Sequence, residues 1–555
     1  MADNHNTSNI GQAIKTILRL LSLEKKDITD IYIYSIFAGL VSLSLPLGIQ
    51  AIIGFVLAGS ISNSIVVLVG LVLFGTFLSG LLQVRQLQLI EKIEQKYFVR
   101  YALEYGSRIP KLDLGVLDKY YLPELINRFF DISGLQKSLQ KILVDIPAAI
   151  IQIVLGTILL SFYHPLFIAF GLVLLSVVVI IIRFTSSKGF ATSMETSDYK
   201  YKVAAWFEEM ARSIKTFKYA QKTSIHIEKT DELVTSYLHA RTSHFKVLKF
   251  QYWSLIAFKL MVTAAMLILG VVLLIDQEIN IGQFIASDIV IIAIIGSVEK
   301  LVGSMDKVYE ALTAVEKLNK VAEAKIEEIG NMLLAQKEKG VSIKMEHVSF
   351  SYASGYQVLK DINLEAEPGE LVGIIGDSGT GKTTILRILT GAFQNFQGKV
   401  LIDGIPLKNY DLDSIRNQTG ILLGKQDIFM GSLLENITLG NDDIETEDIL
   451  KVSKILGLSD YFESLPLGFE TPLHQGGQKL SSKIRKNILL LRALLGKKRL
   501  LLLEDPFNFL TKEQIDGVKN YIKSKGVTVI HTAYNTERLV DCNKVMQLTH
   551  NGVFV

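Results

Sequence analysis

The distribution of charge along the N-terminal half constrains this chain more than any other feature. No Asp, Glu, Lys or Arg occurs from 31 to 84, and none occurs from 146 to 182. A helix that crosses a membrane needs about 20 consecutive apolar residues, so each run is long enough for two spans. The sequence therefore predicts four membrane-spanning helices in these runs, and two further apolar segments bring the total to six. They fall at 31–58, 65–84, 146–163, 165–182, 254–275 and 281–298.

The composition excludes several other classes of protein. Hydrophobic residues make up 49% and charged residues 20% of the chain, a balance that excludes a disordered protein. The net charge of +3 gives no field that would attract nucleic acid, so no nucleic-acid partner is expected. The single cysteine, Cys542, excludes a disulfide framework and a multi-cysteine metal site. The first 30 residues are mostly polar, so no cleaved signal peptide is expected.

The basic residues predict the orientation of the spans. The short loops expected at 59–64, 164–165 and 276–280 contain no Lys or Arg, whereas the opposite ends of the spans are rich in both. By the positive-inside rule, both termini are predicted to be cytoplasmic. The inner (cytoplasmic) membrane is the expected location, with the lipid bilayer as the surrounding medium.

Four residues within the predicted spans are expected to break a helix or to place a charge in the membrane. Pro46 and Gly48 are expected to break the first span. Lys259 lies near the inner end of its span, where its long side chain can reach the interface. Asp288 lies within the last span and is expected to face a polar cavity, because a carboxylate in a bilayer is costly. A contact of Asp288 with substrate is the sharper alternative.

The two inner loops, 85–145 and 183–253, are long, charged and helical in pattern. Each predicts two helical legs that extend into the cytoplasm, joined by turns near 114–121 and 214–220. A folded domain follows on the same side of the membrane, which favours a contact with it over a solvated hairpin without a partner. Residues 304–340 predict a connecting helix and a linker.

From residue 341 the pattern changes to that of an α/β domain. Short β-like runs, among them "VSIKMEHVSFSY", "LVGIIG", "KVLID", "RLLLLED", "VTVIHTAY" and "KVMQLTHNGVFV", alternate in the middle with helical segments. This alternation predicts a mostly parallel sheet. The expected fold is thus an all-α transmembrane six-helix domain followed by an α/β P-loop NTPase domain. The expected boundaries are 1–25 for an N-terminal cytoplasmic segment, 26–320 for the membrane domain, 321–340 for the linker and 341–555 for the nucleotide-binding domain.

The most specific motif is a glycine-rich loop between a strand and a helix. It reads Gly376-Asp377-Ser378-Gly379-Thr380-Gly381-Lys382-Thr383, with Thr384 opening the helix, and it fits G-x-x-x-x-G-K-[ST]. In such a loop the backbone N–H groups surround phosphate oxygens, Lys382 reaches the β- and γ-phosphates, and the Thr383 hydroxyl ligates Mg²⁺. The helix N-terminus adds positive potential. ATP and Mg²⁺ are the predicted cofactors.

Six spans with long inner legs followed by this loop resemble an ABC exporter half-transporter, a six-span membrane domain fused to an ATP-binding cassette. The segment "PLGIQAIIGFVLAG" is similar to haemolysin-type secretion exporters of Gram-negative bacteria, although the roughly 30 residues before the first span cannot hold the peptidase-like domain many of them carry. The resemblance implies that Tyr352 in "FSY" stacks on adenine; a plain β-strand aromatic is the alternative. "RALLGKKRLLLLEDP" matches the segment that ends in the Walker B acids, which implies Glu504 as an Mg²⁺ ligand.

The sequence departs from the family pattern in the signature motif. Where the family has Leu-Ser-Gly-Gly-Gln, this chain has Leu480-Ser481-Ser482-Lys483-Ile484. The resemblance implies that these residues face the γ-phosphate of ATP held by the partner subunit. Ser481 is retained, but the loss of both glycines removes the close backbone approach they allow. Lys483 is a speculative replacement charge.

The catalytic positions also differ. Glu504-Asp505 stands where the family has Asp-Glu, so the presumed base, Asp505, is one methylene shorter. Tyr534 aligns with the switch histidine, and nearby His531 is expected to be structural. Gly424 aligns with the glutamine that senses Mg²⁺, and Gln426 could replace it only if the loop shifts. Thr511 stands at the D-loop aspartate.

These observations predict an ATP-binding exporter subunit. The resemblance implies that it is an ATP-hydrolysing translocase. The altered residues predict impaired ATP hydrolysis, unless the lineage has compensated for these changes. Its expected partner is a second half-transporter, in a homodimer or a heterodimer. Membrane-fusion and outer-membrane channel proteins are expected partners if the chain serves type I secretion. The alternative is a non-hydrolysing regulatory or scaffold subunit of a secretion complex. The cargo is not readable from the sequence.

Overall fold

The computed structural model describes residues 10–57, 63–114, 122–220, 223–352, 355–424, 426–534, 539 and 542–549. The chain divides into two compact units, one formed by Met1–Pro110 with Tyr121–Ala324 and the other by Lys111–Tyr120 with Lys325–Val555. The first is all helical and is called the membrane unit here. The second contains all the named strands and is called the nucleotide unit. Each is described by itself.

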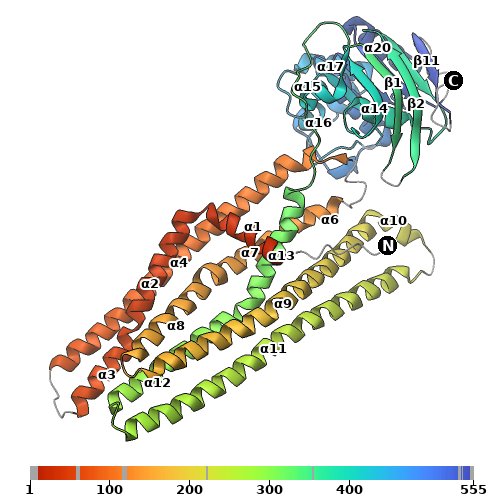
Figure 1. Cartoon of the computed structure of the whole chain (residues 1–555). Helices are drawn as coiled ribbons and strands as arrows, with labels where there is room; N and C mark the ends of the chain where they lie inside the picture. The colour runs from red at the N-terminus through yellow and green to blue at the C-terminus, as the bar shows by residue number, and fades with distance from the viewer. Residues whose placement is uncertain are drawn as a thin grey trace. The chain divides into compact units, whose positions relative to one another are not determined.

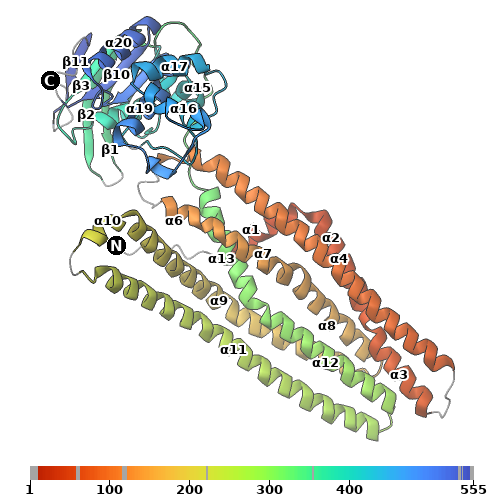
Figure 2. The same ribbon diagram turned by 180° about the vertical axis from the view of Figure 1, so that it is seen from behind.

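Six helical segments of the membrane unit are long and apolar enough to cross a membrane, as the sequence predicts. Their helices are α2 (Lys25–Ser42), α3 (Ser44–Leu57), α4 (Asn63–Arg108), α8 (Ile146–Ser161), α9 (Leu166–Arg212), α11 (Ile225–Ile275), α12 (Ile281–Gly303) and α13 (Met305–Ala322). Helices α9 and α11 run side by side in both views (Figures 1 and 2). Shorter helices complete the unit: α1 (Ile10–Ser22), α6 (Leu122–Asn127), α7 (Asp131–Gln140) and α10 (Ile214–Tyr219).

The first span is broken, but at Leu43 rather than at Pro46. Helix α2 ends at Ser42 and α3 begins at Ser44, which places Pro46 in the first turn of α3. Proline is tolerated there because the first turn leaves its N–H groups without helical partners. Gly48 allows α3 to approach α4 closely, since an added Cβ would lie 2.2 Å from Val72 Cγ2.

The inner loops form long helical legs, as predicted. The stretch beginning at Arg85 continues α4 without interruption to Arg108. In the second loop, the turn expected at 214–220 is the short helix α10, flanked by Ser213 and Ser224. The turn expected in the first loop lies outside the described residues apart from Leu114. The predicted connecting helix is α13, which ends at Ala322.

Buried polar contacts hold the legs together. Gln251 on α11 donates to Thr185 Oγ1 on α9 at 2.7 Å and to Tyr309 Oη on α13 at 3.0 Å. Lys317, also on α13, is fully buried and pairs with Asp198 of α9. A buried charge that lacks a partner is strongly destabilising, so this pair fixes the register of the two helices.

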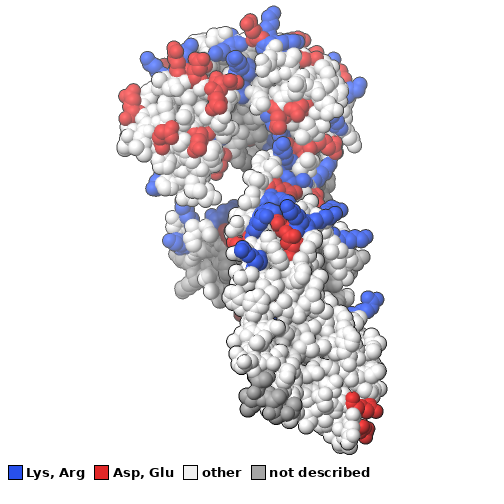
Figure 3. All heavy atoms as spheres, turned by 90° about the vertical axis from the view of Figure 1, so that its left-hand side faces the viewer, with Lys and Arg blue, Asp and Glu red and all other residues white. Residues whose placement is uncertain are grey.

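The charged side chains of the membrane unit are unevenly distributed over its surface. On the face shown in Figure 3, its lower half is almost entirely white, Lys and Arg gather above it, and acidic side chains lie at the lower tip. Asp276 and Glu278 lie in the loop between α11 and α12. Lys259 on α11 forms an ion pair with Glu299, which holds its ammonium group near the C-terminal end of α12.

The nucleotide unit contains a parallel sheet, as predicted, and a separate antiparallel sheet. The parallel sheet has the order β11-β3-β10-β9-β6, formed by Lys544–Gln547, Leu371–Ile375, Thr528–Ala533, Leu500–Glu504 and Thr419–Leu422. The antiparallel sheet has the order β2-β1-β4-β5, formed by Gln357–Ala366, Ile343–Ser351, Gln397–Ile402 and Ile405–Pro406. A two-stranded pair, β7 (Gly431–Ser432) with β8 (Pro472–Leu473), lies outside both.

The run "KVLID" (399–403), one of those from which a mostly parallel sheet is expected, instead falls in β4 (Gln397–Ile402) of the antiparallel sheet. Its partner is β1, with which it pairs in antiparallel register. The central strands β3, β9 and β10 are almost fully buried on both faces, which is typical of a parallel sheet covered by helices. The named α-helices of this unit are α14 (Lys382–Leu389), α15 (Leu412–Asn417), α16 (Leu433–Thr438), α17 (Thr446–Ile455), α18 (Ser459–Glu463), α19 (Ser482–Leu494) and α20 (Lys512–Lys525). Of these, α14, α15 and α19 pack against strands of the parallel sheet.

The linker before β1 is tied to the nucleotide unit by a row of polar contacts. Glu327 accepts a bidentate pair from Arg416, at 2.7 and 2.8 Å. The Arg416 Nε also donates to the carbonyl of Thr390, directly after α14, at 3.2 Å. One residue further along the linker, Glu328 exchanges two hydrogen bonds with the Gln394 side chain. The segment 325–328 is therefore connected to the end of the helix that follows the glycine-rich loop.

Residues at the end of the first leg also pair with this linker. The amide of Asp113 donates to Lys325 O at 3.0 Å, and the amide of Glu327 donates to Lys111 O at 2.9 Å. Between them, Leu112 and Ile326 form an antiparallel bridge. Leu112 is buried, so this bridge is anchored by packing as well as by hydrogen bonds.

Candidate nucleotide site

The glycine-rich loop connects the carboxyl end of β3 to the start of α14, as the sequence predicts. Gly379 and Gly381 have φ values of 87° and 102°, in the region that glycine adopts without strain. At Gly376 an added Cβ would lie 2.4 Å from the carbonyl oxygen of Leu548. These three glycines therefore cannot be replaced without moving the loop. Asp377 and Ser378 are exposed, whereas Thr380 is buried and donates to Asp377 O at 2.9 Å.

Lys382 opens α14 and its side chain folds back over the loop. Its Nζ donates to the carbonyl oxygens of Gly376 at 2.5 Å and of Asp377 at 2.8 Å. The residue is 7% exposed, and burial lowers the pKa of its ammonium group, opposed by the negative charges of Asp505, Asp377 and Glu504. The ammonium group thus lies inside a shell of oxygen atoms at the mouth of the loop.

Glu504, at the end of β9, is held by two donors. Its Oε1 accepts from Thr383 Oγ1 at 2.5 Å, and its Oε2 accepts from the amide of Gly424 at 2.6 Å. The structure thus brings together the two residues predicted to ligate Mg²⁺. Hydroxyl and carboxylate oxygens are the donors that Mg²⁺ prefers, so this pair fits the ion. No group of three or more His, Cys, Asp or Glu able to hold a metal occurs among the described residues.

Asp505, the residue after Glu504, has a positive φ angle. Its φ is 46°, a left-handed conformation that aspartate tolerates better than most residues. Its amide donates to Thr532 Oγ1 on β10 at 3.2 Å. Thr532 is a site neighbour that the sequence analysis missed, since nothing in "VIHTAYN" distinguishes it from a buried strand residue.

Tyr534, which takes the place of the switch histidine, lies directly after β10. Its ring covers Lys382, with Nζ 5.0 Å from the ring centroid. The side chain is 59% exposed, and the negative charge of Asp505, followed by burial and by Glu504, raises the pKa of its hydroxyl. Tyr534 therefore lies among the other predicted catalytic residues.

Gln426 does not point toward Glu504. Its side-chain oxygen accepts from the amide of Leu423 at 3.2 Å, within its own loop. The position next to Glu504 is occupied by Gly424, whose added Cβ would lie 3.3 Å from Glu504 Oε2. From the sequence, Gly424 is only the residue that aligns with the family's glutamine. Its backbone contact with Glu504 is not predictable from the sequence.

Tyr352 lies beside the same loop. Its hydroxyl is 3.0 Å from Thr384 Oγ1 on α14, and its ring packs edge-on against Phe350 and Phe393. His531 lies on β10, where its Nε2 is 3.2 Å from Cys542 Sγ. Burial lowers the pKa of His531 to about 4, consistent with the structural role expected for it.

The altered signature motif begins α19. Leu480 is half-buried, whereas Ser481, Ser482 and Lys483 are exposed. The Ser481 hydroxyl caps the helix by accepting from the amide of Ile484 at 3.2 Å. The motif therefore presents a serine, a helix N-terminus and a lysine to solvent.

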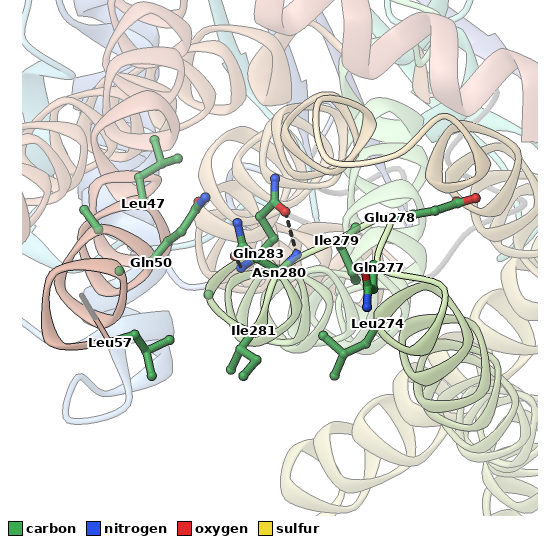
Figure 4. A pocket seen from close by; sticks show the side chains of 13 residues that line it. Leu47, Gln50, Leu57, Leu274, Gln277, Glu278, Ile279, Asn280, Ile281 and Gln283 are labelled. Atoms are coloured by element: carbon green, nitrogen blue, oxygen red, sulfur yellow. Dashed lines mark hydrogen bonds between the residues drawn. The ribbon is translucent and has the colours of Figure 1, made fainter. Parts of the chain in front are cut away.

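The membrane unit contains a separate polar cavity of about 770 Å³ between the end of α3 and the α11–α12 corner. Figure 4 shows the carboxamides of Gln50, Asn280 and Gln283 close to one another at its centre. Asn280 and Gln283 form a capping box at the start of α12, and Gln50 accepts from Tyr163 Oη at 2.6 Å. Asp288, half-buried on α12, is not among the residues that line this cavity, so its expected polar surroundings remain a prediction.

Comparison with known proteins gives relatives that cover up to 90% of the chain. The Lactococcin-A transport/processing ATP-binding protein LcnC of Lactococcus lactis subsp. lactis is 25% identical over 510 residues, which cover 90% of this chain and 70% of LcnC. The transport/processing ATP-binding protein ComA of Streptococcus pneumoniae is 25% identical over 457 residues, 81% of this chain and 63% of ComA. An ATP-dependent lipid A-core flippase of Legionella pneumophila is 26% identical over 277 residues. The chain spans about half the length of that flippase, at 47%.

The fold also matches a solved structure. A bacterial Atm1-family ABC exporter with ATP bound superimposes with a TM-score of 0.85 at 17% sequence identity, covering 96% of this chain and 95% of the exporter. Residues 31–298 match the ABC transporter transmembrane region, and residues 359–508 match the ABC transporter family. The two matches lie in one chain, in the order expected for a half-transporter. This multi-pass membrane protein therefore belongs to the ABC transporter family, with the fused organisation of its half-transporter exporters.

Proposed function

We propose that this chain is an exporter subunit that couples ATP binding, and slow ATP hydrolysis, to movement of a cargo across the inner membrane. The observation that carries the proposal is the contact between Thr383 and Glu504 beside the glycine-rich loop, in a chain with six candidate spans. The spans supply the pathway and the loop supplies the nucleotide site. The names of LcnC, ComA and the lipid A-core flippase support a transport function.

The nucleotide site assigns a role to each part of the loop. Residues 376–384 surround the phosphates, with backbone N–H groups and the N-terminus of α14 facing them. Lys382 leaves its carbonyl partners to reach the β- and γ-phosphates. Thr383 and Glu504 would hold Mg²⁺, which supplies positive charge to the phosphate oxygens. Tyr352, beside Thr384, is placed to stack on adenine.

The proposed hydrolysis is slow because the groups around the attacking water are altered. Asp505 is one methylene shorter than the family's glutamate, and a displacement of ~1 Å can cost on the order of 10²-fold in rate. Gln426 is bonded within its own loop, and Tyr534 lacks the imidazole of the switch residue. Positioning and electrostatics carry most of phosphoryl transfer, so these changes act on its main sources of rate.

The partner in this proposal is a second half-transporter. Half-transporter exporters dimerise, and the second subunit is either another copy of this chain or a related one. Residues Leu480, Ser481, Ser482 and Lys483 would face the γ-phosphate of ATP held by the partner. Both termini and the nucleotide unit are proposed to be cytoplasmic.

The test uses the full chain, purified and reconstituted in lipid nanodiscs. ATP binding and phosphate release are measured for the wild type and for Lys382→Ala. The proposal expects ATP binding that Lys382→Ala weakens by at least tenfold, and a low turnover that the variant abolishes. Turnover that is unchanged in Lys382→Ala would contradict the proposal, because a contaminating ATPase would then be its source.

A second candidate function is that of a non-hydrolysing regulatory or scaffold subunit of a secretion complex. It is favoured by the concentration of departures at the catalytic positions, with the phosphate loop itself intact. Tight ATP binding without turnover, both alone and with a partner half-transporter, would support it. Membrane-fusion and outer-membrane channel proteins would then be partners, and co-purification of the tagged chain from its native membranes tests for them.

A further inference from the structure

Lys382 is in contact with the ring of Tyr534 as well as with its own loop. Three groups surround the ammonium: two backbone carbonyl oxygens, at 2.5 and 2.8 Å, and the face of the Tyr534 ring, with its centroid at 5.0 Å. Lys382 is 7% exposed as a result. Each of these groups interacts favourably with a cation, so the lysine is satisfied within the chain itself.

An aromatic ring attracts a cation through the negative potential of its face. The hydroxyl of Tyr534 is not required for this attraction, because phenylalanine presents a similar face. The negative charges of Asp505 and Glu504 act on both Lys382 and Tyr534, so the two side chains share one acidic environment. Tyr534 is 59% exposed whereas Lys382 is 7% exposed, so the ring lies toward solvent and the lysine lies beneath it.

We propose that Tyr534 is a positioning residue that caps Lys382, so that an incoming phosphate must compete with the aromatic ring for the lysine. The inference rests on the proposed nucleotide-binding function and adds a regulatory step to it. The cap lowers the affinity for every nucleotide that needs Lys382, ATP and ADP alike. It acts through the ring and not through the hydroxyl.

The first test measures nucleotide affinity of the full chain in nanodiscs by isothermal titration calorimetry. Tyr534→Leu removes the aromatic face and is expected to tighten binding of both ATP and ADP, about threefold to tenfold. Tyr534→Phe keeps the face and is expected to bind both nucleotides like the wild type. The opposite pattern, in which Tyr534→Phe weakens ATP but not ADP, would identify the hydroxyl as a γ-phosphate contact and overturn the cap.

The second test needs no nucleotide. Lys382 of the nucleotide-free chain is acetylated with a water-soluble N-hydroxysuccinimide ester, and its modification rate is followed by mass spectrometry. The cap predicts faster modification in Tyr534→Leu, about threefold or more, and an unchanged rate in Tyr534→Phe. An equal rate in all three proteins overturns the proposal.

Phe509→Leu is the matched control, because Phe509 covers Lys486 with Nζ 4.7 Å from its ring centroid. This variant is expected to speed modification of Lys486 and to leave Lys382 and the nucleotide affinities unchanged. Thermal midpoints of all variants verify that they fold. Failure of ATP and ADP to bind the wild type and Tyr534→Leu would contradict the proposed function itself, whereas ATP binding that Tyr534→Leu leaves equal or weaker contradicts the cap alone.

Discussion

The backbone amide of Gly424 donates a 2.6 Å hydrogen bond to Glu504 Oε2, where the family resemblance would place a glutamine side chain opposite an aspartate. The two departures from the family pattern therefore meet in space. Glu504 is longer than aspartate, and a glycine at 424 leaves room for that length. A Cβ at this position would already approach Oε2 to 3.3 Å, closer than an ordinary van der Waals contact.

A double-mutant cycle tests whether these two changes compensate for each other. Gly424→Gln alone is expected to crowd the carboxylate, and Glu504→Asp alone to lose the reach to Thr383 or Gly424. Each single variant should weaken Mg²⁺-dependent ATP binding about threefold to tenfold, whereas the double variant should recover most of the loss. Calorimetric titration of ATP with and without Mg²⁺ measures the coupling. Additive losses would show that the two positions are independent.

Asp505→Glu is expected to raise ATP turnover, because it restores the reach of the presumed base toward the attacking water. A correction of ~1 Å can be worth on the order of 10²-fold, but glutamate adopts the observed φ of 46° less readily than aspartate. We therefore expect a gain of about tenfold, measured as phosphate release from nanodiscs. Asp505→Asn is the control and should not gain activity. Equal rates of phosphate release by the wild type and both variants would show that Asp505 takes no part in hydrolysis.

His531 makes the stability of the nucleotide unit depend on pH. Burial lowers its pKa to about 4, with the charge of Lys519 acting in the same direction. The unfolded chain therefore binds more protons than the folded one between pH 6.5 and about 4, and stability falls as the pH falls through this window. The full loss is roughly 3 kcal/mol.

The variant His531→Leu tests this dependence. Replacing the buried His531 ring by an apolar side chain removes its 3.2 Å contact with Cys542 Sγ but introduces no buried polar group, so the change should cost little at neutral pH. Thermal midpoints between pH 4.5 and 7.5 should fall less steeply in the variant than in the wild type. A parallel decline in both proteins would assign the acid sensitivity to other groups.

The sequence predicts features of this protein wherever a local pattern determines the structure. Charge-free runs predicted the first four of the six candidate spans, apolar segments with one charge each predicted the last two, and the loop at 376–383 predicted the strand and helix on either side of it. The pattern did not separate the antiparallel sheet, because "KVLID" is equally compatible with either sheet. It also missed β6, whose four residues, Thr419–Leu422, are too few for a periodicity.

Contacts between distant residues could not be predicted. The amide of Gly424 and the carboxylate of Glu504 are 80 positions apart, and a backbone donor leaves no trace in the sequence. The same holds for the ring of Tyr534 over Lys382. The local pattern alone identified the loop residues, such as the glycines at 379 and 381, whereas Glu504 and Tyr534 were identified by the family resemblance.

Gly48 and Val72 offer a test of packing in the membrane unit. Gly48→Ala places a Cβ about 2.2 Å from Val72 Cγ2, so α3 and α4 must separate or Val72 must change rotamer. Overpacking of this kind typically costs about 1–3 kcal/mol. The thermal midpoint of Gly48→Ala in detergent should fall, and Val72→Ala in the same chain should restore it. Gly54→Ala is the control, since nothing lies within 4 Å of its added Cβ.

The bidentate pair of Arg416 with Glu327 fastens the linker to the end of α14. Arg416→Lys keeps the charge but loses both the bidentate geometry and the contact with Thr390 O. A hydrogen bond to a charged group contributes about 1.5–3 kcal/mol to stability. The Glu327 side chain is only 9% exposed, so solvent screens its pair with Arg416 little. Amide hydrogen exchange over residues 325–334 should therefore rise at least tenfold in the variant.

The control for this prediction is Lys337→Ala. Lys337 lies in the same linker, but its side chain is 60% exposed and its Nζ is as far as 3.9 Å from Asp403 Oδ2. An exposed pair at that distance contributes little, so its exchange pattern should match the wild type. If the pair also transmits nucleotide binding from α14 to the linker, ATP should protect 325–334 from exchange in the wild type and in Lys337→Ala but not in Arg416→Lys. Equal protection in all three proteins would restrict the pair to a structural role, since the linker would then respond to nucleotide without it.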